Sequence, residues 1–476
     1  MMQNISTEKP TNYRWVIVSL LFFATTVNYL DRQVLSLLQP LLAEEFHWTD
    51  SDYGTITAIF SLVYAISMLF AGKIIDKLGT KKGYIWSIII WSVGASIHAL
   101  AGVVTEGLVG LPNADALRAV AKGTDLAAQI SMISVMSFTF CRIVLAIGES
   151  GNFPAAIKAT AEYFPKKDRA FATGIFNSGA NVGAILAPLT VPVMAEFWGW
   201  ESAFIIVGIV GFIWVGFWHF FYHTPEKNAK MNEAERLYIN QYSHTEDSTA
   251  VDNSPKITYK QALKYNQTWA FAVGKFLTDG VWWFFLFWTP AYLKAQFGMT
   301  GTEIALPIAV LYTITVAGSV LGGKFPTYFI NKGMNPYAGR MRAMLIIAFL
   351  PLVVLFAQPL GYISFWIPVL LIAIGGSAHQ AWSANLFTTV GDMFPKKAVA
   401  TITGIGGMAG GIGSFFINKG SGMLFTHAEE TNMTFLGFEG KPAGYFMVFI
   451  FCAIAYLLGW TIMKSLVPKY KPIKDL

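Results

Sequence analysis

The sequence predicts an all-α integral membrane protein with twelve transmembrane helices in two pseudo-symmetric halves of six helices each. Three observations lead to this prediction: long apolar runs, basic residues concentrated in alternate connections, and an internal repeat. Of the 476 residues, 54% are hydrophobic and 13% are charged. That charged share is about half of the share in an average soluble protein. A soluble core does not need so many apolar side chains, so a bilayer is the expected environment.

The chain contains twelve apolar runs, each close to the roughly 20 residues that span about 30 Å of hydrocarbon. The runs lie near residues 14–39, 53–74, 83–104, 131–156, 169–193, 202–222, 268–296, 303–323, 341–359, 362–389, 399–424 and 443–464. Each run predicts one membrane-spanning helix.

Basic residues predict the orientation of these helices, because they fall in or beside the even-numbered connections. They are Lys77, Lys81 and Lys82, then Lys158, Lys166, Lys167 and Arg169, then Lys324, Lys332, Arg340 and Arg342, and finally Lys396 and Lys397. By the positive-inside rule, both termini and every even connection are cytoplasmic. The net charge of +6 is then a consequence of topology, and no basic cluster predicts nucleic-acid binding. The chain is polar before Trp15, so no cleaved signal peptide is expected.

An internal repeat relates the two halves. Phe164-Pro-Lys-Lys167 recurs as Phe394-Pro-Lys-Lys397, and Gly183 and Gly413 continue the same offset. Thr173-Gly-Ile also recurs as Thr403-Gly-Ile in this register. One helix–loop–helix unit is therefore used twice, which equates the fifth span with the eleventh and predicts parallel repeats about an axis normal to the membrane.

The repeat and the polar stretches predict the domain boundaries. Residues 1–222 form the first six-helix half, 223–267 a polar cytoplasmic linker with a surface helix, and 268–476 the second half. A second polar stretch, 103–129, is an unusually long periplasmic connection. An insertion tolerated at the surface is its default interpretation.

Two ionisable residues lie inside the fourth apolar run. Arg142 and Glu149 are seven residues apart, close to two helical turns, so both point to one face about 10 Å apart along the axis. A charge against lipid costs at least about 2.5–3.5 kcal/mol, so such residues usually face a bundle interior or an aqueous pathway. A structural ion pair between helices is the alternative.

The first apolar run carries a second charged pair, Asp31 and Arg32. Adjacent residues on a helix diverge by about 100°, so the two side chains cannot serve one narrow face. One can turn to a cavity while the other bridges to a neighbouring helix. The alternative, a merely polar helix end, is disfavoured because an apolar stretch, 34–38, follows.

The connection between the second and third spans predicts a gating latch. Gly72 and Gly79 allow a sharp turn and a close helix approach. Asp76 can accept hydrogen bonds from a helix N-terminus across the interface between the halves, and Lys81 satisfies the positive-inside rule. An ordinary charged turn is the alternative. The glycine-rich stretch 404–413 predicts small-residue helix packing.

The tenth span carries a dense polar set, of which some members must face the central cavity. The candidate binding residues there are Ser377, His379, Trp382 and Ser383. His379 can either titrate near neutral pH or serve as a hydrogen-bonded structural histidine. In the seventh span, Lys275 and Asp279 form either a local bridge or a direct substrate contact.

Several of these motifs resemble those of a known family. The segment 72–82 resembles the loop signature of the major facilitator superfamily, and the six-plus-six arrangement resembles its fold. Asn28-Tyr-Leu-Asp-Arg32, Arg142 with Gly148-Glu149, and Asn152-Phe-Pro154 are similar to the anion:cation symporter family. Within that family, 375–383 resembles bacterial hexuronate transporters.

The resemblance implies residue roles. It implies that Arg142 engages a substrate carboxylate and that Asp31 and Glu149 carry protons. It further implies polar contacts from Tyr29, Arg32 and Tyr64. A glutamine that binds sugar hydroxyls in the fifth span of a related galactonate carrier has no obvious counterpart. Asn177 or Asn181 is the candidate replacement, which leaves the identity of the sugar acid open.

The expected function is a proton-coupled symporter that imports a sugar-acid anion, a hexuronate such as galacturonate or glucuronate, across a bacterial inner membrane. Alternatives are an aldonate or other organic-anion symporter, a phosphate or organophosphate antiporter, and a nontransporting membrane sensor. An enzyme is not expected, because the sequence has no nucleophile–base set, metal cluster or nucleotide loop. The expected protein is a monomer in the lipid bilayer without cofactor, metal or nucleic acid. Its two cysteines, Cys141 and Cys452, lie in apolar runs and suggest neither a disulfide nor a metal site.

Overall fold

The computed structural model describes residues 9–165, 168–240 and 257–473, and these residues are almost entirely helical. Its first-half helices are α1 (Arg14–Glu45), α2 (Asp50–Leu78), α3 (Thr80–Ile97) with η1 (His98–Leu100) and α4 (Ala101–Val109), α6 (Asp125–Glu149) with α7 (Asn152–Tyr163), α8 (Arg169–Trp198) and α9 (Trp200–Phe221). Its second-half helices are α12 (Asn266–Phe297), η3 (Gly301–Ile304) with α13 (Ala305–Asn331), α14 (Pro336–Phe349) with η4 (Leu350–Phe356) and α15 (Ala357–Leu360), α16 (Trp366–Met393), α17 (Lys396–Glu430) and α18 (Lys441–Leu466).

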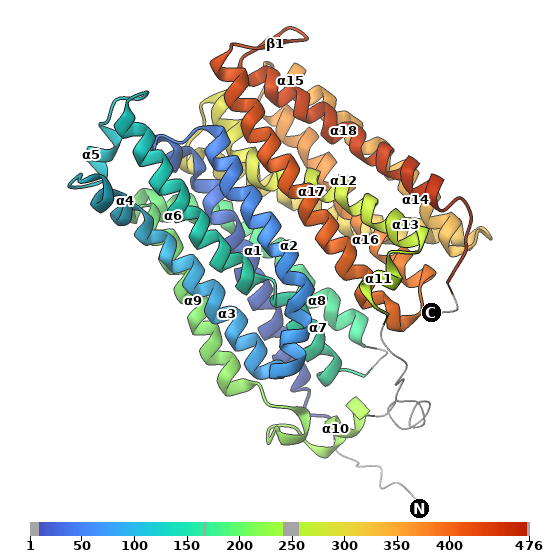
Figure 1. The fold of residues 1–476 in the computed structure, drawn as a ribbon. Helices are drawn as coiled ribbons and strands as arrows, with labels where there is room; N and C mark the ends of the chain where they lie inside the picture. Colours follow the sequence, from blue (N-terminus) through green and yellow to red (C-terminus); the bar gives the residue numbers. More distant parts are fainter. Residues whose placement is uncertain (1–8, 166–167, 241–256, 474–476) are drawn as a thin grey trace, which may run out of the picture.

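The remaining elements are short and lie between these long rods. They are α5 (Ala114–Arg118), η2 (Pro225–Lys227), α10 (Glu233–Asn240), α11 (Tyr259–Ala262), and the antiparallel strands β1 (Thr434–Phe435) and β2 (Phe438–Glu439). α5 and β1 lie at one end of the bundle, which we call the α5 end, and α10 lies at the opposite end, the α10 end (Figure 1).

Polarity divides the long rods into two groups. In the described part of the chain, nine helices or helix pairs are long and apolar enough to cross a membrane. α1, α16 and α17 are as long but are not among the nine, because polar residues and glycines lower their hydropathy. Several of the predicted site residues lie on α1 and α16, and the glycine-rich segment lies on α17.

The packing of the rods repeats between the halves. α1 packs on α8 as α12 packs on α17, and α2 packs on α6 as α13 packs on α16. A Cβ at Gly183 would lie 2.3 Å from the carbonyl oxygen of Thr26, and one at Gly413 would lie 1.9 Å from that of Phe276. The two glycines equated by the sequence repeat therefore perform the same close helix approach in both halves. This is the expected pseudo-symmetric fold, although Lys166 and Lys167 of the first motif lie outside the described residues.

The two halves are joined most tightly at the α5 end. Lys441 forms an ion pair with Asp50 at 2.8 Å, and Lys294 forms one with Glu44 at 2.5 Å. Among the described residues, these are the ion pairs that join the halves. The Tyr53 hydroxyl also donates to the carbonyl of Phe287 at 2.7 Å.

Glycine contacts show that α2 and α17 diverge toward the α10 end. A Cβ at Gly422 would lie 2.4 Å from the carbonyl oxygen of Asp50 at the α5 end. Near the other end, the nearest atom to a Cβ at Gly404 belongs to the Leu69 side chain, at 3.8 Å. The bundle is thus closed at its α5 end.

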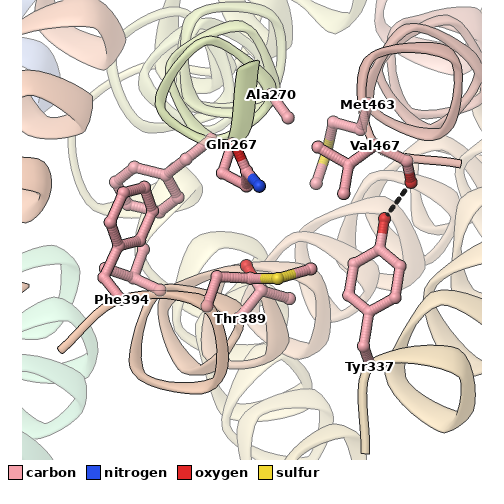
Figure 2. A pocket seen from close by; sticks show the side chains of 10 residues that line it. Gln267, Ala270, Tyr337, Thr389, Phe394, Met463 and Val467 are labelled. Carbon is pink, nitrogen blue, oxygen red and sulfur yellow. Dashed lines mark hydrogen bonds between the residues drawn. The ribbon is translucent and has the colours of Figure 1, made fainter. Parts of the chain in front are cut away.

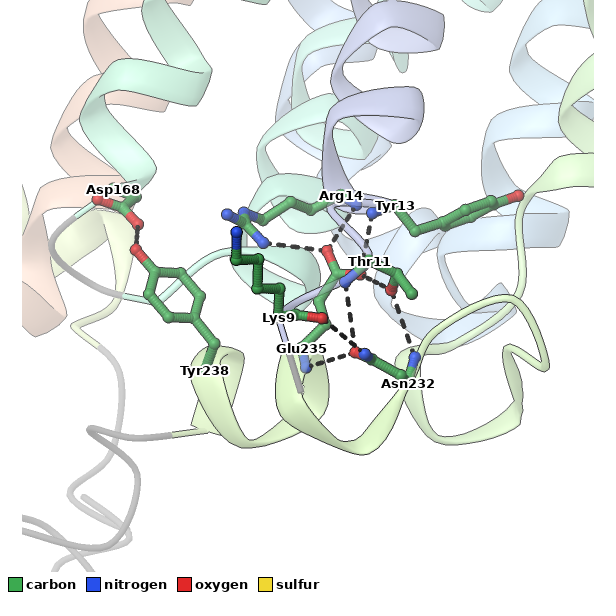
Figure 3. A network of polar contacts seen from close by, with 8 residues as sticks. All are labelled: Lys9, Thr11, Tyr13, Arg14, Asp168, Asn232, Glu235 and Tyr238. Atoms are coloured by element: carbon green, nitrogen blue, oxygen red, sulfur yellow. Dashed lines mark hydrogen bonds and ion pairs between the residues drawn. The ribbon is translucent and has the colours of Figure 1, made fainter. Parts of the chain in front are cut away.

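The first part of the predicted linker is fastened to the first half. Glu235 of α10 accepts hydrogen bonds from the backbone amides of Tyr13 and Arg14, at 2.9 and 3.0 Å (Figure 3). It also forms an ion pair with the Arg14 side chain at 3.1 Å. Tyr238 donates to Asp168 beside α8 at 2.6 Å. α10 therefore caps α1 from a distant segment. The rest of the predicted linker includes residues 241–256, which lie outside the described residues.

The long connection between α4 and α6 is packed on the first half. Leu117 is fully buried, and Arg118 donates to Glu45 at the end of α1 at 2.5 Å. The hydrogen bond that Arg118 donates to Glu45 holds the pKa of Arg118 above its usual value. Through α5, this connection is therefore held against the end of α1.

Candidate functional site

The centre of the candidate site is a buried ion pair between α1 and α6. Arg32 donates to Glu149 Oε2 from Nε at 3.0 Å and from Nη2 at 2.6 Å. Both side chains are almost completely buried. Arg32 therefore bridges to a neighbouring helix, which is one of the two roles expected for the Asp31–Arg32 pair.

Aromatic rings surround the Arg32 guanidinium. Its central carbon lies 4.7 Å from the ring centroid of Tyr64, 5.1 Å from those of Tyr29 and Trp283, and 5.8 Å from that of Phe60. Tyr29 and Tyr64 were both predicted as site residues, and the structure brings them to the same guanidinium. Trp283 comes from α12 of the other half and was not predicted as a site residue.

Arg142 lies beside this pair but is bonded differently. Its Nε and Nη1 atoms are buried and have no hydrogen-bond partner among the described residues. Its guanidinium carbon lies 5.2 Å from the ring centroid of Phe60, and its charged neighbours include Asp31 and Glu149. Although Arg142 and Glu149 share a helix, Glu149 pairs with Arg32 instead.

Asp31 is the second buried acid of the site. Both of its carboxylate oxygens are buried without a hydrogen-bond partner among the described residues, as is Glu149 Oε1. The amide atoms of Asn28, one turn away on α1, are in the same state. Buried polar groups normally have partners, so such a cluster indicates bound water, a proton or a ligand.

The chemistry of this cluster suits an anion and protons. A guanidinium binds a carboxylate through two parallel hydrogen bonds, and it does so most strongly where water is excluded. A buried carboxylate without a partner can relieve its burial cost by binding a proton. Among the described residues, no group of three or more His, Cys, Asp or Glu side chains is arranged to hold a metal ion.

The candidates on α16 make their described contacts within the second half. The Ser377 hydroxyl donates to the carbonyls of Ile314 and Ala373, at 3.0 and 2.9 Å, and thus fastens α16 to α13. Its role in the structure is helix packing.

His379 and Trp382 form an aromatic and polar group with α12 and α18. His379 Nδ1 lies 3.0 Å from the Tyr456 hydroxyl, and its ring stacks on Trp282 at 5.3 Å. Trp382 is fully buried and packs against Tyr456, and its indole nitrogen has no described partner. Ser383 is half-buried on the same helix.

The segment predicted to be a latch has the expected turn but not the expected contacts. Gly79 has a φ of +78°, a conformation that favours glycine. Asp76 pairs with Lys158 of α7 at 3.0 Å, so its partner lies in the same half and not across the interface, as was expected. A Cβ at Gly72 would meet no described atom within 4 Å, so the expected close approach is absent there. Lys81 is half-buried in the first turn of α3.

Lys275 and Asp279 form a local bridge one turn apart on α12. Their side chains meet at 2.6 Å. Lys275 also lies 4.4 Å from the ring centroid of Phe387. Because Asp279 neutralises Lys275, this lysine is a poor candidate for holding a substrate anion in this conformation.

Two cavities lie away from the buried charges. The first, between α12, α14, α16 and α18, has a volume of about 20 Å³ and is too small for a sugar acid (Figure 2). The second, about 390 Å³ at the α5 end, is lined by Glu44 and Glu196 and by no basic residue. Neither cavity offers a positive group to an anion.

Comparisons with known proteins agree with this architecture. The chain matches the Major Facilitator Superfamily over residues 21–417. It is 30% identical to the hexuronate transporter of Escherichia coli K12 over 457 residues, which are 95% of this chain and 94% of the relative. It is 31% identical to the galacturonate transporter of Dickeya chrysanthemi over 316 residues, 66% of this chain and 82% of the relative.

A solved structure has the same fold. A bacterial homologue of the human lysosomal transporter Spinster, in an inward-facing and unoccupied conformation, superposes with a TM-score of 0.71. The two sequences are 17% identical, and the match covers 97% of this chain and 99% of that one.

Fold and site together describe a multi-pass membrane transporter, with charged groups buried in the first six-helix half where it meets the second. The chain belongs to the Major Facilitator Superfamily. It is a transporter and not an enzyme.

Proposed function

We propose that this protein is a proton-coupled symporter that imports a hexuronate anion such as galacturonate or glucuronate. The observation that carries the proposal is the Arg142 guanidinium, which is buried with two nitrogens lacking any described partner. It lies beside Asp31, whose two oxygens lack a described partner as well. The full-length similarity to a hexuronate transporter supports the substrate class.

Arg142 is the proposed anchor for the substrate carboxylate. A sugar acid is a monoanion near neutral pH, so it supplies the charge that this guanidinium needs. The charge of Asp31 competes with the anion for Arg142. Protonation of Asp31 removes this competitor, so proton binding and anion binding favour each other.

Glu149 is the proposed second proton carrier, and the structure gives it a specific partner. Its carboxylate neutralises Arg32 in the present conformation. A proton on Glu149 weakens this pair and leaves the Arg32 guanidinium able to contact the sugar acid. Tyr29 and Tyr64, which lie on the same guanidinium, would then contact the substrate as well.

The proposed orientation places the α10 end in the cytoplasm of a bacterial cell and the α5 end outside the inner membrane. The distribution of Lys and Arg supports this orientation. Because the halves are joined at the α5 end, the conformation is then inward-facing. We further propose that the protein is a monomer and that its two halves, residues 1–222 and 268–476, rock about the site. Residues 223–267 link the halves, and the segment from Gly72 to Lys81 acts in gating.

Uptake into proteoliposomes tests the function. Galacturonate, glucuronate, galactonate and phosphate would each be offered under an imposed inward proton gradient and without one. The proposal expects gradient-driven accumulation of a hexuronate. Preferred uptake of galactonate would shift the substrate to an aldonate, and exchange of preloaded phosphate without proton coupling would contradict the proposal. The antiporter alternative is disfavoured because Lys275 of the second half is neutralised by Asp279.

A further inference from the structure

Trp283 is a described residue of the second half that contacts Arg32 of the buried Arg32–Glu149 pair. Of the four rings within 6 Å of the Arg32 guanidinium, three come from α1 and α2, and the fourth, Trp283, comes from α12. Trp283 also packs against Tyr64 at 5.9 Å and Phe60 at 5.8 Å. One indole therefore contacts both the aromatic surface of α2 and the positive charge of α1.

We propose that Trp283 is a positioning residue that couples the protonation of Glu149 to closure of the bundle at its α5 end. The inference rests on the proposed function of Glu149 as a proton carrier and deepens it. It assigns the step by which a proton in the first half changes the affinity of one half for the other.

The direction of the coupling follows from the electrostatics of an aromatic face. The face of an indole is negative and attracts a nearby cation. While Glu149 is ionised, its carboxylate offsets much of the Arg32 charge, so the pair as a whole attracts the ring weakly. When Glu149 is protonated, the full charge of Arg32 acts on the ring. Protonation therefore strengthens a contact that exists when the halves are joined as they are here.

This coupling has the sign that import requires. A proton taken up from outside by Glu149 favours the conformation closed at the α5 end, which presents the site to the α10 end. Loss of the proton weakens the Trp283 contact and allows the halves to separate again at the α5 end. A desolvated cation–π contact changes an equilibrium by roughly tenfold or more, which is enough to bias a balanced pair of conformations.

Other charged and titratable groups face the same pair. Asp31 and Arg142 both interact electrostatically with Glu149. Tyr29 and Tyr64 interact electrostatically with Arg32. All four belong to the first half and move with Glu149. Trp283 differs from them because its contact depends on how the halves are docked.

A double-mutant cycle on the conformational equilibrium tests the proposal. Spin labels on Asp125→Cys at the start of α6 and Glu430→Cys at the end of α17, both exposed at the α5 end, report the opening of that end. The native Cys141 and Cys452 would be replaced by alanine. Distance distributions in lipid nanodiscs then give the ratio of closed to open molecules for each variant.

Glu149→Gln imitates the protonated acid and is expected to raise the closed-to-open ratio roughly tenfold. Trp283→Leu removes the aromatic face, so the same Gln substitution in this background is expected to change the ratio less than about threefold. Trp283→Phe keeps a weaker face and should give an intermediate shift. If Glu149→Gln had the same effect with the native Trp283 as in the Trp283→Phe variant, the proposal would be overturned even if Trp283→Leu fails to fold.

Phe287→Leu is the matched control for lost packing. Phe287 packs against Trp283 at 5.3 Å and Phe60 at 6.2 Å, but Arg32 has no described ring contact with it. Phe287→Leu should change the closed-to-open ratio by the same factor whether position 149 is the native Glu or the substituted Gln. If Phe287→Leu reduced the effect of Glu149→Gln on the closed-to-open ratio as much as Trp283→Leu does, Trp283 would act only through packing and the inference would be overturned.

Proton-driven uptake separates the failure of this inference from the failure of the proposed function. If Glu149→Gln leaves accumulation intact, the proton role of Glu149 fails and the coupling fails with it. If Glu149→Gln abolishes accumulation but the cycle is additive, Glu149 keeps its role and Trp283 alone loses its own.

Discussion

Arg32 donates both of its hydrogen bonds to a single oxygen of Glu149, Oε2, at 3.0 and 2.6 Å. The other oxygen, Oε1, is buried without a partner among the described residues. The carboxylate thus has one oxygen committed to an ion pair and one free to accept a proton. This asymmetry allows Glu149 to be protonated before its bond to Arg32 is broken.

Substitution of Arg142 should remove the substrate anchor. We expect Arg142→Ala to weaken binding of galacturonate about 10- to 100-fold, because a hydrogen bond to a charged group contributes about 1.5–3 kcal/mol. Arg142→Lys keeps the charge without the two-pronged geometry and should recover part of the affinity. Titration calorimetry on the purified protein measures both, with the exposed Lys264→Ala as control. Unchanged affinity in Arg142→Ala would refute the anchor.

Asp31 should affect coupling more than affinity. Asp31→Asn keeps the size of the side chain and removes the charge that competes for Arg142, so we expect substrate affinity to equal or exceed that of the wild type while proton-driven accumulation is lost. Comparison of counterflow with gradient-driven uptake in proteoliposomes makes the distinction. Accumulation at the wild-type level would mean that Asp31 carries no transported proton.

The pair between Lys441 and Asp50 should hold the α5 end closed. Lys441→Gln leaves the largely buried Asp50 without its partner, so we expect the closed-to-open ratio to fall about tenfold. Labelling of Thr55→Cys, at a half-buried position near the start of α2, by a membrane-impermeant reagent reports the opening. Glu429→Gln is the control, because Glu429 is the other partner of Lys441 and is 63% exposed. Equal effects of the two variants would contradict a gate at Asp50.

The paired glycines should be intolerant of a side chain. Gly413→Ala would place a Cβ 1.9 Å from the carbonyl oxygen of Phe276, and Gly183→Ala one 2.3 Å from that of Thr26. Each is expected to destabilise the fold by about 1–3 kcal/mol or more. Thermal unfolding in detergent measures the loss. Gly420→Ala on the same helix as Gly413 meets no described atom within 4 Å and should be neutral, and similar losses in all three would remove the helix-approach explanation.

The sequence was sufficient for the architecture because membrane helices are encoded locally. Apolar runs predicted the long helices, and the register of Gly183 with Gly413 predicted two equivalent packing contacts that the structure contains. The helix ends were less predictable: α1 continues to Glu45 and α6 begins at Asp125, both beyond the ends of the predicted apolar runs.

The pairings within the site were not predictable from the sequence. Arg32 and Glu149 are 117 residues apart, and their spacing along the chain does not reveal which charged group each will meet. Arg142 and Glu149 share one helix, but the structure pairs Glu149 with Arg32 of α1. Asp76 likewise found Lys158 in its own half. The sequence signal for Trp283 was weak, because it is one of several aromatic residues that follow Lys275 and Asp279 on α12.

The central claim is that protonation of Glu149 couples an anion to a proton gradient. Its most direct test is galacturonate uptake into proteoliposomes containing wild type or Glu149→Gln, at fixed membrane potential and with an imposed pH gradient. The account predicts that wild type accumulates the sugar acid above its external concentration, whereas Glu149→Gln exchanges it but only equilibrates. Accumulation by Glu149→Gln equal to that of wild type would contradict the account.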